Sequence, residues 1–187
     1  MSIGYKIDAV KFDRRSYKFC HDASAVRSKF GEIPDLELVD NYSKLNTRKA
    51  LTQCARYFKR EFRYDFVQFA ERPERGETPE NTIGYLFESH HKIIYDRALA
   101  VGGCCFRWRE YPGLRPMWAL QWIWIHPYKR GAGILSRAWP EFEKRFGHFL
   151  VEPPISSGMK YFLKKHNYQF PLQESESENI TITQLAE

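Results

Sequence analysis

The sequence predicts a single α/β domain in which helices flank a mixed, mostly antiparallel sheet. Three observations support this fold class: an amphipathic helix begins near Asn46, apolar strand-like runs follow up to residue 125, and a glycine-bearing turn then leads into a helix, a strand and a second helix. A change of apolar spacing across a glycine turn is typical of a strand that passes into a helix. With 187 residues, of which 43% are apolar, the chain can bury one core.

The first helix has the most regular pattern in the chain. Asn46 or Thr47 can cap it, and apolar residues then recur at three-and-four spacing with Arg and Lys between them. These apolar residues are Ala50, Leu51, Cys54, Tyr57, Phe58 and Phe62. The pattern before the helix is weaker, and we expect a helix near 22–30 and a turn at 31–35. The charged segment 70–81 predicts an exposed loop, which is a plain surface connection or, as the alternative, a mobile lid.

Four apolar runs predict a meander of strands, at 82–88, 92–96, 98–108 and 117–125. Only Gln121 interrupts the last run, so we expect this strand in the middle of the sheet with both faces covered. All five tryptophans lie between residues 108 and 139, interleaved with arginines. Such a cluster can stack nucleic-acid bases, although core packing is the commoner role of tryptophans on a strand.

Two helices are expected after the glycine turn. The first begins at Ile134, and Pro140 should kink it or confine its regular part to the first two turns. A strand at 149–152 follows and ends at two prolines. The second helix, with a cap at Ser156 or the next serine, runs to Lys165. Its inward-facing residues are Met159, Phe162 and Leu163.

The charge balance favours anionic partners. The chain has 29 Lys and Arg against 23 Asp and Glu, a net charge of +6. Nucleic acid, coenzyme phosphates and acidic protein surfaces are all compatible with this excess, and so is a globular protein that simply has a basic surface.

The cysteines and the hydropathy indicate a cytoplasmic protein without membrane contact. The four cysteines, Cys20, Cys54, Cys104 and Cys105, have no C-x-x-C spacing, so we expect buried thiols in a reducing compartment. No window approaches 18 consecutive apolar residues, and charges interrupt the N-terminal region where a signal peptide would be apolar. The histidines are too scattered to predict a metal site.

The turn after the long strand suits an anionic ligand. Gly131 and Gly133 allow the main chain to approach a ligand closely, and the uncapped amides of the following helix carry a partial positive charge. Lys129 and Arg130 add full charges. A pyrophosphate fits this arrangement, and a tight turn with solvated cations is the alternative. The turn lacks the glycine and acid pattern of nucleoside-triphosphate and dinucleotide motifs.

The stretch "IHPYKRGAGIL" resembles the coenzyme motif of the Gcn5-related N-acetyltransferase superfamily, an apolar-x-Pro step followed by Arg/Gln-x-x-Gly-x-Gly/Ala. Ile125, Pro127, Arg130 and Gly133 match it, and Leu135 replaces the final small residue. The segment "FLKKHNY" is similar to a later motif of the superfamily. Architecturally, the tryptophan-bearing strand, "ILSR" and "VEPPISSG" most resemble the catalytic domain of cohesin acetyltransferases, without their zinc finger.

The resemblance implies acetyl-CoA as co-substrate and no metal. The residues it assigns to the coenzyme are Trp124, Ile125, Lys129, Arg130, Gly131, Ala132, Gly133 and Ile134. It also implies that the strand through Trp124 splays from the strand at 149–152, with the thioester at the fork. We expect one domain over 1–170, with a helical, acceptor-side part at 1–80, a coenzyme-binding core at 81–170 and a flexible acidic tail at 171–187.

Three residues are candidates for catalysis. Glu152 lies at the predicted fork and matches the catalytic aspartate of the cohesin group, which makes it the expected base; a surface glutamate is the alternative. Gln121 could orient a water or the acceptor, or be a satisfied buried glutamine. The tyrosine that many superfamily members use as an acid falls at Leu163, so Tyr161 is the expected substitute, with His166 and Tyr168 nearby.

The resulting functional prediction is acetyl-CoA-dependent N-acetyl transfer to an amine. The acceptor is a small molecule or a protein lysine, and an amine carried by RNA, such as an aminoacyl-tRNA, would also use the positive charge. The alternative is a non-catalytic module of the same fold that binds nucleic acid or a protein partner through its basic surface.

Overall fold

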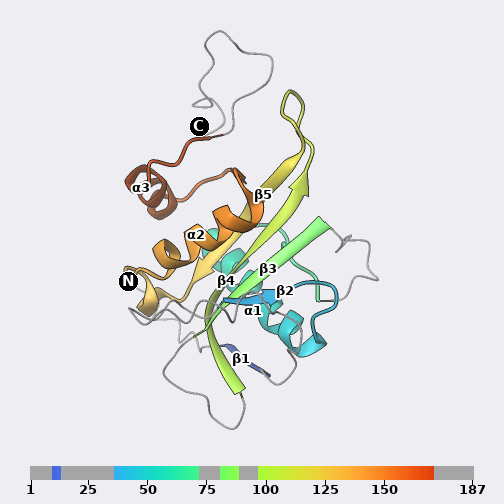
Figure 1. Ribbon diagram of the computed structural model, residues 1–187. Helices are drawn as coiled ribbons and strands as arrows, with labels where there is room; N and C mark the ends of the chain where they lie inside the picture. Colours follow the sequence, from blue (N-terminus) through green and yellow to red (C-terminus); the bar gives the residue numbers. More distant parts are fainter. Residues whose placement is uncertain (1–9, 14–35, 72–80, 89–96, 171–187) are drawn as a thin grey trace.

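The computed structural model describes residues 10–13, 36–71, 81–88 and 97–170 (Figure 1). Four sequence expectations lie outside these residues: the helix near 22–30, the turn at 31–35, the strand at 92–96 and the flexible tail. Most of the loop expected at 70–81 also lies outside them.

Six strands form one sheet, with the order β2-β3-β4-β5-β6 and with β1 paired to β4. The strands are β1 Val10–Asp13, β2 Leu36–Val39, β3 Thr82–Glu88, β4 Arg97–Arg109, β5 Met117–Ile125 and β6 Leu150–Val151. All pairs are antiparallel except β5 with β6. The predicted mixed, mostly antiparallel sheet is therefore confirmed.

The N-terminal part is not only helical, as the sequence suggested, because β1 and β2 add two strands to the sheet. Each is four residues long. A segment of that length has too few positions for apolar alternation to be recognised, and its place is decided by pairing with the long strands β3 and β4.

In the part of the chain that the structure describes, three α-helices cover the sheet: α1 Leu45–Phe62, α2 Ile134–Phe146 and α3 Ser157–Lys165. The Ser156 side chain caps α3 by accepting from the Met159 amide, as predicted. Of the two effects expected of Pro140, an end of the regular part within the first two turns is wrong, since the helix continues to Phe146; a kink stays a prediction. Proline removes one backbone hydrogen bond, but Phe142 and Phe146 are buried and hold the last turns against the sheet.

Helix α1 lies on one face of the sheet. Its apolar residues pack with Leu86, Trp122 and Trp124, and Gly84 lets the helix approach closely, because a Cβ at that position would collide with the Leu51 side chain. The cysteines at 54, 104 and 105 are buried thiols outside any disulfide bond, as predicted. Burial raises the pKa of the Cys54 thiol.

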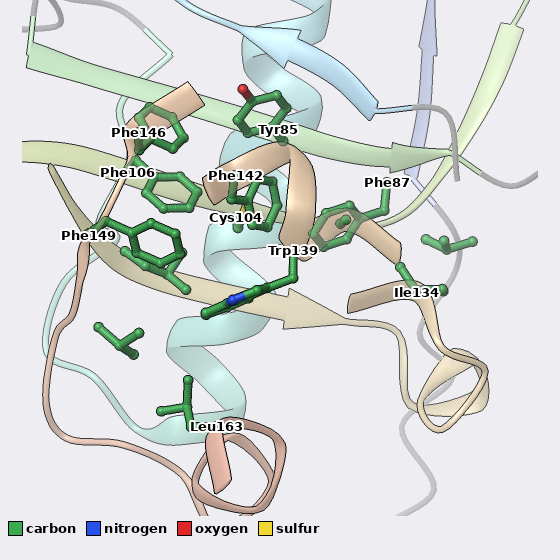
Figure 2. Packing of buried hydrophobic residues seen from close by; sticks show 14 residues of the cluster. Tyr85, Phe87, Cys104, Phe106, Ile134, Trp139, Phe142, Phe146, Phe149 and Leu163 are labelled. Carbon is green, nitrogen blue, oxygen red and sulfur yellow. The ribbon is translucent and has the colours of Figure 1, made fainter. Parts of the chain in front are cut away.

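Helices α2 and α3 cover the opposite face through a cluster of aromatic rings (Figure 2). Phe142 is fully buried and contacts the rings of Tyr85, Phe87, Phe106 and Trp139. Three of the five tryptophans are buried in the two cores, at positions 122, 124 and 139, which favours the packing interpretation for them. The sheet is therefore held between two independent aromatic-rich layers.

Neither a membrane-spanning helix nor a cluster of metal ligands occurs in the described residues. The helices there are too short or too polar to cross a bilayer. No three side chains of His, Cys, Asp or Glu in the same part of the chain come together as a metal site would require.

Truncation of Phe142 should strongly destabilise the protein. Replacing this fully buried ring by alanine removes its contacts and leaves a cavity, so we expect Phe142→Ala to lower the free energy of unfolding by about 3–5 kcal/mol in urea titrations. The control is Phe66→Ala, because Phe66 is 59% exposed; its effect should stay below about 0.5 kcal/mol. Equal losses in both variants would contradict the packing described here.

Candidate functional site

The sheet opens into a fork between β5 and β6. The two strands pair only at Ala119 with Leu150 and at Leu120 with Val151, and the Glu152 amide donates to the Leu120 carbonyl at 3.0 Å. Within the described residues, β5 has no strand on that side beyond this point. The expected splay between these strands is therefore present.

A β-bulge lies where the fork opens. Cys105 faces Trp122 and Phe106 faces Leu120, so Gln121 has no partner on β4. An extra residue in one strand changes which side chains face which surface. Accordingly, Leu120 belongs to the core under α2, whereas Trp122 belongs to the core under α1.

The backbone beyond the bulge presents hydrogen-bonding groups to the open edge. The His126 amide donates to the Val101 carbonyl of β4 at 2.8 Å. Because these groups alternate between the two edges of a strand, the N–H and C=O groups of Ile123 and Ile125 point away from β4. A ligand that lies along this edge can pair with them as an added strand would.

The glycine turn stands at the end of the open edge. Gly131 and Gly133 have φ values of 74° and 75°, in the left-handed region. Helix α2 begins after Gly133 without a side-chain cap, so its first amides have no partner within the helix and carry a partial positive charge. A Cβ placed on Gly131 would meet nothing within 4 Å, which leaves room beside these amides for a ligand.

Arg137 adds a cation that the sequence analysis did not single out. Its Nη1 donates to the Ala132 carbonyl at 2.9 Å and lies 3.0 Å from where a Cβ on Gly133 would be. Arg137 is the last residue of the "ILSR" segment and lies in the first turn of α2. Its position four residues after Gly133 could have predicted that its side chain lies at the glycine turn. Lys129 flanks the turn on its other side.

Arg130 is engaged within the protein. Its Nη1 and Nη2 lie 2.7 Å from the two carboxylate oxygens of Glu61, and its Nε donates to the Ile125 carbonyl at 2.9 Å. The Trp124 indole N–H donates to the same carboxylate at 2.9 Å. The sequence carried no signal for Glu61, because it is one of several charged residues at the end of α1.

The pKa of Glu61 reflects these contacts. Partial burial by itself would raise the pKa, but the hydrogen bonds from Arg130 and Trp124 and the positive charge of Arg130 outweigh it and hold the pKa below its ordinary value. Glu61 is therefore ionised at neutral pH and paired with Arg130.

A pocket of about 180 Å³ lies at the fork. One wall is aromatic and comes from the end of α1, and the other walls come from β5, the segment after β6 and the start of α3. Its lining residues include Phe58, Phe62, Tyr64, Gln121, Trp122, Glu152, Ile155 and Met159. Gln121 is only 7% exposed, and its Oε1 has no hydrogen-bond partner among the described residues. A buried amide oxygen of this kind favours a ligand that donates a hydrogen bond.

Glu152 is held at the pocket by two side chains. Its Oε1 accepts from Arg109 Nε at 2.9 Å and from the Tyr111 hydroxyl at 2.6 Å, and its side chain is 15% exposed. Burial and the negative charge of Glu152 raise the pKa of Tyr64, so the Tyr64 hydroxyl is protonated at neutral pH near this carboxylate. Arg109 and Tyr111 were not predicted, because only folding brings them to a residue more than 40 positions away.

The expected substitutes for the missing tyrosine do not line this pocket. Tyr161 is 71% exposed on α3. His166 is hydrogen-bonded to Ser136 at 3.1 Å, and the Tyr168 hydroxyl donates to the Phe149 carbonyl. Leu163 is buried in the core under α2.

The fold is similar to that of a solved acetyltransferase domain. The acetyltransferase domain of xEco2 matches with a TM-score of 0.52 and 16% identity, over 78% of this chain and 91% of that one. A ribosomal-protein-alanine N-acetyltransferase from Brucella melitensis biovar Abortus 2308 matches with 0.47 and 15%, over 79% and 99%. An aminoglycoside acetyltransferase, meta-AAC0020, from an uncultured soil metagenomic sample matches with 0.46 and 18%, over 78% and 91%. No protein-family model and no curated protein matches the chain.

The similarity to the xEco2 domain confirms the predicted fold. The chain shares the α/β fold of that domain, with a single mixed sheet between helices.

Removal of the Glu61 charge should destabilise the protein at neutral pH but not in acid. The folded-state pKa is below the ordinary value of 4.5, so the stabilising contribution is present above the unfolded-state pKa and is lost as the pH falls through the folded-state pKa. In thermal melts we expect Glu61→Gln to unfold below the wild type at pH 7, and the difference to shrink below pH 4.5. Glu110→Gln, at an exposed position, is the control. A difference that does not change with pH would contradict this assignment.

Proposed function

We propose that this protein transfers an acetyl group from acetyl-CoA to an amine. The observation that carries the proposal is the fork: the open edge of β5 runs from a pocket with a carboxylate to a turn with free helix amides. An elongated ligand with an anionic end and a reactive opposite end is the kind that suits such a site.

The residues of the turn fit the pyrophosphate of coenzyme A. The first amides of α2, together with Lys129 and Arg137, supply donors and positive charge, and Gly131 and Ala132 are exposed beside them. The pantetheine arm would lie along the open edge and pair with the backbone of Ile123. Trp124, also predicted at the coenzyme site, has a buried side chain, so its contribution is indirect.

The fork pocket fits an amine acceptor. An aromatic wall attracts an alkylammonium group, and Gln121 and Glu152 provide oxygens that accept its N–H groups. When bound, acetyl-CoA supplies an activated acetyl group. With acetyl-CoA bound, the amine would give up a proton to Glu152 as its nitrogen forms a bond to the acetyl carbon and the carbon–sulfur bond breaks. The thiolate would take up a proton from solvent, and Glu152 would release its own proton to solvent.

The pocket accommodates a primary amine on an unbranched arm, such as a lysine side chain or a small alkylamine, against its aromatic wall. Positioning of the amine provides most of the expected acceleration, since direct attack needs only a neutral amine at close range.

A second function is supported by the residue at position 163. Leu163 stands where superfamily members have a tyrosine, and none of the three substitutes lines the pocket. These observations favour a non-catalytic module that binds nucleic acid or a protein through its basic surface. Binding to RNA or DNA that weakens steeply with salt, without affinity for coenzyme A, would support that function instead.

Coenzyme binding can be measured by isothermal titration with acetyl-CoA. We expect Lys129→Glu to raise the Kd about ten- to a hundredfold, because a contact to a charged group is typically worth that factor. Lys144→Glu is the matched control, since this exposed lysine lies at the opposite end of α2. Equal increases of the Kd in both variants would mean that only the net charge matters, and would exclude Lys129 as a coenzyme contact. No binding of acetyl-CoA to the wild type would exclude the proposed function.

Glu152 is expected to act on kcat and not on coenzyme affinity. A general base typically contributes about 10²–10⁴ in rate, so Glu152→Gln should lower kcat within this range while the Kd for acetyl-CoA stays constant. Acceptors can be identified by mass spectrometry of a lysate incubated with isotopically labelled acetyl-CoA. Glu110→Gln is the control, and full activity of Glu152→Gln would exclude Glu152 as the base.

A further inference from the structure

Glu61 joins three elements of the site that are distant in sequence. It lies in the last turn of α1, and its carboxylate accepts from the Trp124 indole on β5 and from Arg130 in the glycine turn. Arg130 in turn donates through Nε to the Ile125 carbonyl at 2.9 Å. The four residues therefore form one continuous hydrogen-bonded chain, which we call the Glu61 clamp.

The position of Glu61 is unfavourable without these partners. A carboxylate near the C-terminal end of a helix meets the negative end of the helix dipole. Trp124 is only 2% exposed, so its indole N–H also needs an acceptor inside the protein. Both requirements are met by the same contacts, because Arg130 compensates the charge and Glu61 accepts from the indole.

The clamp uses the hydrogen-bonding capacity of Arg130 within the protein. Three of its nitrogens contact Glu61 or Ile125, and its charge is matched by the adjacent carboxylate. Arg130 precedes Gly131, whose left-handed backbone begins the turn. Because its Nε donates to the carbonyl of Ile125, the last residue of β5, the fixed arginine side chain holds the start of the glycine turn against the end of the strand.

We propose that Glu61 is a positioning residue for coenzyme binding, which acts by holding Arg130 as a brace for the glycine turn. This inference rests on the proposed function. The brace keeps the free amides of α2 aimed at the phosphates, and it occupies the Ile125 carbonyl, so that Ile123 is the residue left to pair with the pantetheine arm. Arg130 then contributes to affinity through the shape of the turn and not as a phosphate ligand.

Direct binding of phosphate by Arg130 would predict the opposite change in coenzyme affinity. If Arg130 bound phosphate directly, Glu61 would compete with the coenzyme for the same guanidinium. Removing the carboxylate would then release a cation and tighten binding. The brace predicts instead that loss of the carboxylate loosens the turn and weakens binding.

The test is titration of the full chain with acetyl-CoA and with coenzyme A, for the wild type, Glu61→Gln, Glu61→Ala, Arg130→Gln and the double variant Glu61→Gln/Arg130→Gln. We expect Glu61→Gln to raise both Kd values about tenfold, the factor of one contact to a charged group, and Glu61→Ala to raise them at least as much. The double variant should bind like Arg130→Gln alone, because each single change already breaks the brace. A lower Kd in either Glu61 variant, or additive effects in the double variant, would overturn the proposal.

Two further readouts separate positioning from general damage. The kcat of Glu61→Gln at saturating acetyl-CoA should stay within about threefold of the wild type, while the KM for acetyl-CoA rises. The reason is that the variant loses binding energy that is equal in the ground state and the transition state, which changes KM and leaves kcat nearly constant. Glu71→Gln is the matched control, because Glu71, like Glu61, pairs with an arginine. Its partner is Arg56 of α1, at 4.0 Å. Its Kd should equal that of the wild type, and a change as large as that of Glu61→Gln would overturn the proposal.

The clamp can be tested apart from the coenzyme. In the ligand-free protein, the melting temperatures of the two single variants and the double variant should be non-additive by about 2–4 °C, the shift that corresponds to a typical pair interaction in a chain of this size. If the wild type binds no coenzyme but this coupling is found, the proposed function fails while the clamp itself stands. If the coupling is absent, the brace is excluded even if the coenzyme binds.

Discussion

The short pairing between β5 and β6 is the constraint on which the rest of the site depends. Two residue pairs join these strands, and beyond them the backbone of β5 has polar groups on one edge without a strand to receive them. Buried or half-buried backbone groups of this kind require partners. The bulge at Gln121 lies at the same point, so the open edge, the pocket and the change of facing side chains coincide.

Two arginines of the site are held in ion pairs. Arg130 pairs with Glu61, and Arg109 pairs with Glu152. The first pair joins the glycine turn to the end of α1, and the second joins the end of β4 to the segment after β6. Because these arginines are engaged, the positive charge available to a ligand at the turn comes from the helix amides and from Lys129 and Arg137.

The helices on the two faces of the sheet contribute to the site in different ways. Helix α2 packs its aromatic residues against the sheet (Figure 2). This packing fixes the position of the start of α2 and therefore of the glycine turn that precedes it. Helix α1 covers the other face and provides at its end both the aromatic wall of the pocket and the carboxylate of the clamp. A shift of α1 would therefore alter the pocket and the glycine turn together.

The sequence by itself determined the long elements, the turn and the fold class. Periodicity over many residues located α1, β3 and β5, and the glycines and cations of the turn were legible because they are contiguous. Only the tertiary structure decided the rest. The short strands β1 and β2 exist through pairing, α2 continues past Pro140 through packing, and the partners of Glu61 and Glu152 come from distant segments. Local patterns record propensity and burial, whereas a specific hydrogen bond between remote side chains leaves no periodic trace in a single sequence.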